Sequence, residues 1–167
     1  MSESPDRLAA PWLFHRANAL YEPGDQISPG NWGRLVLGIG PAHPLYFREY
    51  LWERIRRAEF PARPSRMRAC FAFEAIEAAD KFVQNADWPT YTYAVHLTDP
   101  NVALHRGDTS WLEIALIQEF RTFEGVEGCA RHYWNGDERA PGQFEIVVAG
   151  SLEIVQRLTP IRENGHA

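Results

Sequence analysis

The sequence has few cysteines, no long apolar run and no glycine-rich motif of the dinucleotide-binding type. Each of these absences reduces the number of protein classes to which the chain can belong. Cys70 and Cys129 are the only cysteines among 167 residues, and two thiols make neither a disulfide framework nor a metal site. We expect both to be buried small hydrophobes. No stretch approaches the length of a membrane span, and the N-terminus lacks a basic segment followed by an apolar one. A cytoplasmic location without membrane attachment is therefore expected by elimination.

Charge and histidine spacing disfavour two further classes of protein. The formal net charge of −5 argues against an extended basic face for nucleic acid. The six histidines are scattered and show no i, i+4 pair of the metalloprotease type. Six arginines nevertheless lie between positions 54 and 68. They fit either a solvated helix face and loop or a site for a ligand phosphate, since guanidinium groups suit bidentate phosphate contacts.

What is present is typical of one ordinary globular domain. A hydrophobic content of 45% and a charged content of 23% match average globular composition and argue against disorder of the whole chain. We predict a single domain over residues 10–160, with loose polar tails at 1–9 and 161–167.

The apolar patterning predicts an α+β fold. Predicted strands cover residues 12–15, 68–73, 90–97, 144–148 and 152–158, and predicted helices cover 43–57, 74–84, 111–120 and 127–134. Residues 21–40, rich in Gly and Pro, are predicted to be a long structured loop. Residues 149–151 are predicted to form a hairpin or tight bend between the last two strands.

Three polar or aromatic positions are candidates for function. His15 and its neighbour Arg16 end the first strand, where a histidine is either a satisfied structural residue or a ligand-binding one. Phe71 and Phe73 point the same way from a strand, which suits core packing or a stacking wall for a flat ligand. Glu145 lies in an apolar strand, either on the solvent face of an edge strand or, if it points inward, as a catalytic carboxylate. Asp108 is predicted to cap a helix.

Five short motifs in a fixed order carry a family resemblance. They are residues 14–17 (Phe-His-Arg-Ala), 22–25 (Glu-Pro-Gly-Asp), 48–53 (Arg-Glu-Tyr-Leu-Trp-Glu), 64–66 (Pro-Ser-Arg) and 105–108 (His-Arg-Gly-Asp). In this order they resemble the ADP-ribosyltransferase superfamily, and within it a bacterial family of unknown function. Residues 129–134 look like the segment before the catalytic strand in DNA-modifying toxin members. The resemblance implies a split mixed β-sheet core with flanking helices.

The resemblance also implies a site for NAD, which is the substrate. It places Glu145 and His15 as catalytic residues, and it assigns NAD binding to a set made of His15, Arg16, Ser65, Arg66, Phe71 and Phe73. Phe occupies the aromatic position where Tyr is more usual, and Gln143 stands where arginine-modifying members carry a second acid.

The expected function is NAD-dependent mono-ADP-ribosyl transfer to a protein or nucleic-acid acceptor, as a toxin or phage-defence effector. A carboxylate beneath the ribose would stabilise the positive charge that builds as the nicotinamide bond breaks. Two alternatives stay open. One is NAD-dependent RNA 2′-phosphotransfer, and the other is a non-catalytic binding module with Glu145 on the outside.

Overall fold

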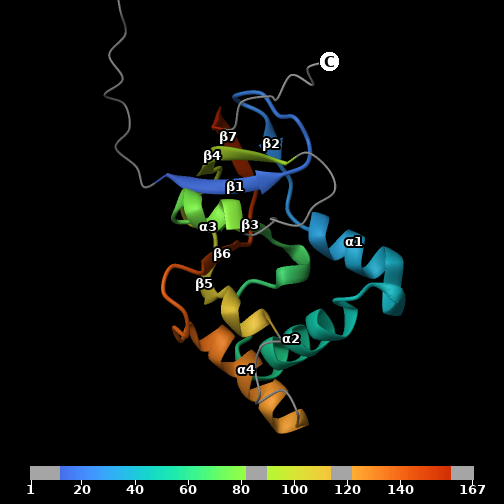
Figure 1. Ribbon diagram of the computed structural model, residues 1–167. Coiled ribbons are helices and arrows are strands. Elements are labelled where there is room, and N and C mark those ends of the chain that lie inside the picture. The colour runs from blue at the N-terminus through green and yellow to red at the C-terminus, as the bar shows by residue number, and fades with distance from the viewer. Residues whose placement is uncertain (1–11, 82–89, 114–121, 159–167) are drawn as a thin grey trace, which may run out of the picture.

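The computed structural model describes residues 12–81, 90–113 and 122–158, which form one seven-stranded sheet with helices against it (Figure 1). The strand order is β2-β7-β4-β1-β3-β6-β5 and every pairing is antiparallel. The α+β class is therefore confirmed, whereas the expected mixture of parallel and antiparallel strands is wrong for the described residues. The strands are β1 (Leu13–Ala17), β2 (Gln26–Ile27), β3 (Cys70–Phe73), β4 (Tyr91–Leu97), β5 (Leu104–Asp108), β6 (Phe144–Val148) and β7 (Leu152–Arg157).

The sheet curls around its own core instead of lying flat. One buried cluster joins side chains of β3 and β6, such as Ala72 and Val148, with side chains of β4 and β7, such as Val95 and Ile154. The hinge lies between β1 and β3, whose only register pair is Phe14 with Phe73. The two halves of the sheet thus face each other across this core, as packed sheets do.

This curvature explains why the predicted hairpin at residues 149–151 is wrong. β6 and β7 are consecutive, but three other strands stand between them in the sheet. Because the two halves face each other, residues 149–151 form the other predicted alternative, a tight bend that leads from one half of the sheet to the other at the surface.

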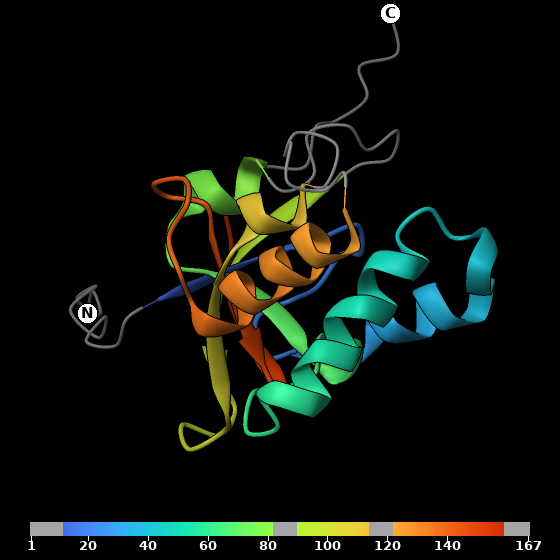
Figure 2. The ribbon, with the colours of Figure 1, turned by 90° about the horizontal axis from the view of Figure 1, so that it is seen from below.

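The helices are α1 (Asn31–Ile39), α2 (Tyr46–Glu59), α3 (Ile76–Lys81) and α4 (Phe123–Asn135), with short 3-10 turns that include η2 (Arg66–Arg68) and η3 (Thr109–Leu112). α3 packs against β1, β3 and β4, whereas α2 and α4 cover the outer face of the β3-β6-β5 half. Figure 2 shows α4 lying across this half of the sheet, α2 beside it and α1 outermost. A second core forms here, around Trp52 of α2, Trp134 of α4 and Val147 of β6.

The prediction of a loop over residues 21–40 is wrong, because β2 and α1 lie inside it. Gly30 and Gly40 flank α1 with positive φ angles of 90° and 68°, so the glycines that indicated a loop are the ends of the helix. The apolar spacing of Trp32, Leu35, Val36 and Ile39 was the available helical signal.

The remaining predictions are confirmed with shifted ends, apart from β5, which was missed. α2, α3, α4, β3, β4 and β6 fall within a few residues of the predicted ranges. Asp108 caps as predicted, since its carboxylate accepts from the backbone N–H of Ser110 at 2.8 Å. The helix expected at 111–120 is seen only as the turn η3, since residues 114–121 lie outside the described chain, as do the predicted tails at 1–9 and 161–167. None of the described helices could cross a membrane.

Candidate functional site

A cavity of about 640 Å³ opens beside the strand that carries the two candidate phenylalanines. Phe71 and Phe73 both line it, which confirms that they point the same way from β3. α1 contributes Trp32, α2 contributes Arg48, and η2 contributes Arg66. The wall therefore combines aromatic rings with guanidinium groups, the mixture that a flat ligand carrying phosphates requires.

Glu145 lies behind this wall, and it is fully buried on an interior strand. β6 pairs with β3 and β5, which sets Glu145 opposite Phe73 on one side and Gly107 on the other. The interpretation of Glu145 as a solvent-facing residue on an edge strand is therefore wrong. Its Oε1 accepts a hydrogen bond from the Tyr133 hydroxyl at 2.5 Å and forms an ion pair with Arg66. Its Oε2 has no partner among the described residues.

Gly107 makes the approach of Tyr133 possible. A Cβ atom at this position would lie 2.4 Å from the Tyr133 ring, inside van der Waals contact. Only glycine lets the ring lie against β5 with its hydroxyl at Glu145. Burial raises the pKa of Tyr133 to about 12 despite the nearby Arg66, so the hydroxyl keeps its proton and can donate it at neutral pH.

Arg66 joins Glu145 to a second buried carboxylate, Glu49 of α2. Its Nε donates to Glu49 Oε2 at 3.0 Å, and its other guanidinium nitrogens reach Glu145, Tyr133 and Glu49 Oε1. The guanidinium also lies over the Phe71 ring, 4.8 Å from its centroid. Arg66 thus occupies the space between the Phe71 ring and the carboxylate of Glu145.

The network balances its own charge. Arg48 donates to Glu49 at 2.6 Å, so two guanidinium groups face two carboxylates. Burial by itself raises the pKa of Glu49, but Arg66 and Arg48 outweigh burial and hold it at about 2. Burial lowers the pKa of Arg66, and Glu49 together with Tyr133 reverses that effect and raises it. All four side chains are therefore held in place by buried, charge-assisted hydrogen bonds.

His15 is close to the cavity wall but does not line it. Its Nδ1 lies 2.6 Å from the carbonyl oxygen of Phe71, so Nδ1 carries the proton and donates it. Burial lowers the pKa of His15, and this keeps the ring neutral at pH 7. The contact ties β1 to β3 just behind the phenylalanine wall.

Two of the predicted NAD-binding residues lie away from the cavity. Arg16 donates to Asp80, Thr90 and Thr92, at 2.6 to 2.7 Å, on the far side of β1. Ser65 donates to Glu53 at 2.9 Å and lines a different groove.

Three buried polar atoms near the cavity have no partner among the described residues. They are Glu145 Oε2, Arg48 Nε and Trp32 Nε1, and the side chains of Arg48 and Trp32 line the cavity itself. Buried polar atoms are nearly always satisfied in folded proteins, so this acceptor and these two donors are available to water or to a polar ligand.

Sequence reasoning missed Arg48, Glu49 and Tyr133. The available signal was a pair of adjacent charges, Arg48-Glu49, placed one helical turn before the buried apolar residues Trp52 and Ile55. For Tyr133 the only signal was its place in the motif at residues 129–134.

One comparison with known proteins gives a match. A family model described as a protein of unknown function (DUF2441) matches residues 39–160. Among curated proteins, none matches this sequence.

Proposed function

The chain belongs to the DUF2441 family, and we propose that it is an NAD-dependent mono-ADP-ribosyltransferase that acts on a protein or nucleic-acid acceptor. One observation carries this proposal. The three strands to which the family resemblance assigns a histidine, an aromatic residue and an acid are neighbours in the order β1-β3-β6. Between α1 and α2 on one side and these strands on the other lies a cavity walled by Phe71 and Phe73, with Glu145 behind it.

The side chains fit the parts of NAD in a consistent order. The rings of Phe71 and Phe73 offer a face on which nicotinamide could stack. Lys81, which also lines the cavity, would offset charge on the diphosphate, and Arg48, whose own charge is balanced by Glu49, would donate to it through its open Nε. The open Oε2 of Glu145 is an acceptor for a ribose hydroxyl, and within the described part of the chain it is the one buried carboxylate oxygen of the network that has no partner.

The chemistry follows from Glu145. When the nicotinamide–ribose bond breaks, its electrons leave with nicotinamide and positive charge develops on the ribose. A carboxylate held by Tyr133 through Oε1 would stabilise that charge through Oε2. His15 would act from behind, because its bond to the Phe71 carbonyl fixes the position of the stacking wall.

Arg66 has to move before the ribose can reach this carboxylate. Glu145 has no exposed surface, and Arg66 is the cavity-lining residue that is bonded to it. Arg66 also holds Glu49 through Nε and a second nitrogen, so its guanidinium can leave Glu145 and still keep an ionic partner. Access to Glu145 therefore requires that the Arg66 guanidinium leave Glu145 and remain bound to Glu49 alone.

The proposal is tested with purified protein and NAD. We expect NAD to raise the melting temperature of the wild type and nicotinamide to be released over time. Glu145→Gln is expected to keep the thermal shift with NAD and to lose the release of nicotinamide. Glu153 is an exposed glutamate of β7, and Glu153→Gln is expected to change neither measurement. If NAD produces no thermal shift and no nicotinamide, the proposal fails. If Glu145→Gln retains release, the assignment of the site is wrong.

A further inference from the structure

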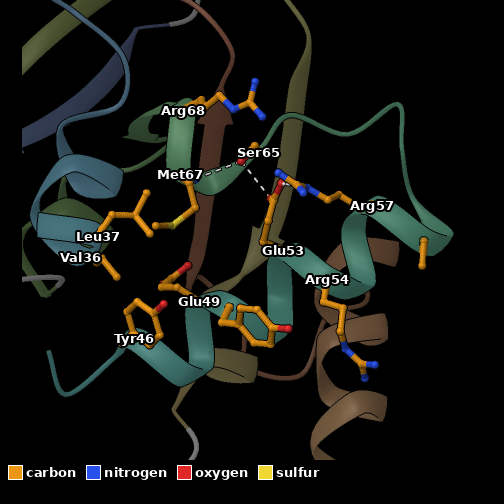
Figure 3. A pocket seen from close by; sticks show the side chains of 12 residues that line it. Val36, Leu37, Tyr46, Glu49, Glu53, Arg54, Arg57, Ser65, Met67 and Arg68 are labelled. Atoms are coloured by element: carbon orange, nitrogen blue, oxygen red, sulfur yellow. Dashed lines mark hydrogen bonds and ion pairs between the residues drawn. The ribbon is translucent and has the colours of Figure 1, made fainter. Parts of the chain in front are cut away.

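A second groove lies between α1, α2 and η2, apart from the candidate site. Its volume is about 610 Å³, and its inner wall is apolar, formed by Val36 and Leu37 of α1, Tyr46 and Tyr50 of α2, and Met67 of η2. Figure 3 shows Leu37 and Met67 pointing toward each other across the groove, with Tyr46 below them. This groove does not depend on any NAD chemistry.

The groove opens beside the second half of α1, because only the first turns of this helix pack on η2. Gly33 packs directly on η2, and a Cβ atom there would lie 1.9 Å from the carbonyl oxygen of Met67. Gly30 adds a backbone bond to Ala69 at 3.0 Å. The first turns of α1 are therefore pressed against η2, while the groove opens at the later residues Val36 and Leu37.

The two helices carry most of the exposed large apolar side chains. Among the described residues, five of the eight such side chains lie on α1 and α2: Leu35, Leu37, Ile39, Phe47 and Tyr50. Leu37 and Tyr50, which line the groove, are 63% and 62% exposed. Single exposed apolar residues are ordinary, but two of them in one apolar groove, beside the partly buried Tyr46 and Met67, are typical of an interaction surface.

The polar rim of the groove is positive. Its two carboxylates are already neutralised, because Glu49 is held by Arg48 and Arg66, and Glu53 accepts from both Arg56 and Arg57. One carboxylate shared by two guanidinium groups leaves a positive charge at this end of the groove.

Arg68 extends this positive rim, because it makes no ion pair with any described residue. Arg54 also lines the groove, but its charge is balanced by Glu127 of α4. The chain as a whole carries a net charge of −5, so this arginine rim is a local exception.

We propose that this groove binds an acidic amphipathic segment of a partner protein, with large apolar side chains in the groove and carboxylates against the arginine rim. The charge of the rim selects against a second copy of this chain. In a two-fold dimer formed through this surface, the same patch meets itself, which would bring two arginine rims together. The apolar side chains line a hollow, which fits inserted side chains better than the flat surface of a lipid bilayer.

The test uses a defined probe, a fluorescein-labelled 16-residue peptide of Leu and Glu in a helical amphipathic pattern. Its control is the same peptide with every Glu replaced by Gln. We expect saturable fluorescence anisotropy with the Glu peptide, at least tenfold weaker binding of the Gln peptide, and weaker binding as salt rises. No binding of the Glu peptide up to about 1 mM, or equal binding of both peptides, overturns the proposal.

Matched variants locate the binding. Leu37→Asp and Arg68→Glu are each expected to weaken binding of the Glu peptide at least tenfold. Leu104→Asp on β5 and Arg157→Glu on β7 are expected to leave the binding affinity unchanged. All four are checked for folding by circular dichroism. Unchanged binding by Leu37→Asp places the peptide elsewhere and overturns the proposal.

Two other occupants are distinguished by separate measurements on the same proteins. A dimer seen by light scattering that Leu37→Asp dissociates assigns the groove to a second copy. Co-sedimentation with vesicles of anionic phospholipid that depends on Leu37, without peptide binding, assigns it to a membrane surface. Either result overturns the proposal, whatever the outcome of the NAD assays.

Discussion

Replacing Arg66 by methionine is the sharpest test of the buried network. The change keeps an apolar stem of similar length and removes the one cation, among the residues that the structure describes, that touches both Glu49 and Glu145. Removing one partner of a buried ion pair costs about 3–5 kcal/mol, because the partner stays buried without compensation. For a chain of this size that loss lowers the melting temperature by about 10 °C.

The pH dependence of this loss of stability is a second, independent test of the buried network. In the wild type Glu49 has a pKa of about 2 against an ordinary value of 4.5, a difference worth about 3 kcal/mol. Because the folded-state pKa is depressed, this stability is present above about pH 4.5 and is lost as the pH falls toward 2. In Arg66→Met the buried carboxylate of Glu49 favours its protonated form. The loss of unfolding free energy relative to wild type is therefore smaller at pH 5 than at pH 7.

Urea denaturation followed by circular dichroism at pH 7 and pH 5 measures both effects. Arg57→Met is the control, since Arg57 pairs with Glu53 at 2.9 Å on the surface, where such a pair contributes about 0.5 kcal/mol. Tyr133→Phe removes only the hydroxyl bonds to Arg66 and Glu145, and should cost an intermediate amount of about 1–3 kcal/mol. A loss for Arg66→Met no larger than that for Arg57→Met refutes the reasoning.

Three further outcomes follow from other contacts. Gly107→Ala forces a methyl group against the Tyr133 ring and should cost about 1–3 kcal/mol in urea titrations, whereas Gly128→Ala, in open space on α4, should be neutral or slightly stabilising. Burial lowers the pKa of His105 to about 4, so its neutral form stabilises the fold above about pH 6.5 and that contribution is lost as the pH falls toward 4; His105→Gln should flatten this part of the stability profile. Phe71→Ala removes one stacking face and should weaken NAD binding at least tenfold by calorimetry, and an unchanged affinity would place the ligand elsewhere.

The sequence predicts those features of the structure that depend on residues close together along the chain. Phe71 and Phe73 were predicted to share a face because alternation along a strand is a local property. The inward position of Glu145 was one of two alternatives, and the choice between them needed to know that β6 lies between β3 and β5. Whether a strand is interior is not encoded within the strand.

The errors have the same cause. Residues 149–151 are compatible with a hairpin, and only the curvature of the whole sheet turns them into a crossing between its two halves. The partners of Arg66 were missed for the same reason, because Glu49 and Glu145 lie 17 and 79 residues away along the chain. Pairing between such distant charges follows from tertiary packing, which no local pattern reports.

The measurement that bears most directly on the proposed activity is the rate of nicotinamide formation from NAD by wild type and Glu145→Gln, over a range of NAD concentrations. The account predicts release by the wild type and a kcat at least about a hundredfold lower in Glu145→Gln, with KM changed only a few-fold, because the carboxylate acts mainly on the charge that develops as the bond breaks. Absence of nicotinamide from the wild type, or an equal kcat in the variant, would contradict it.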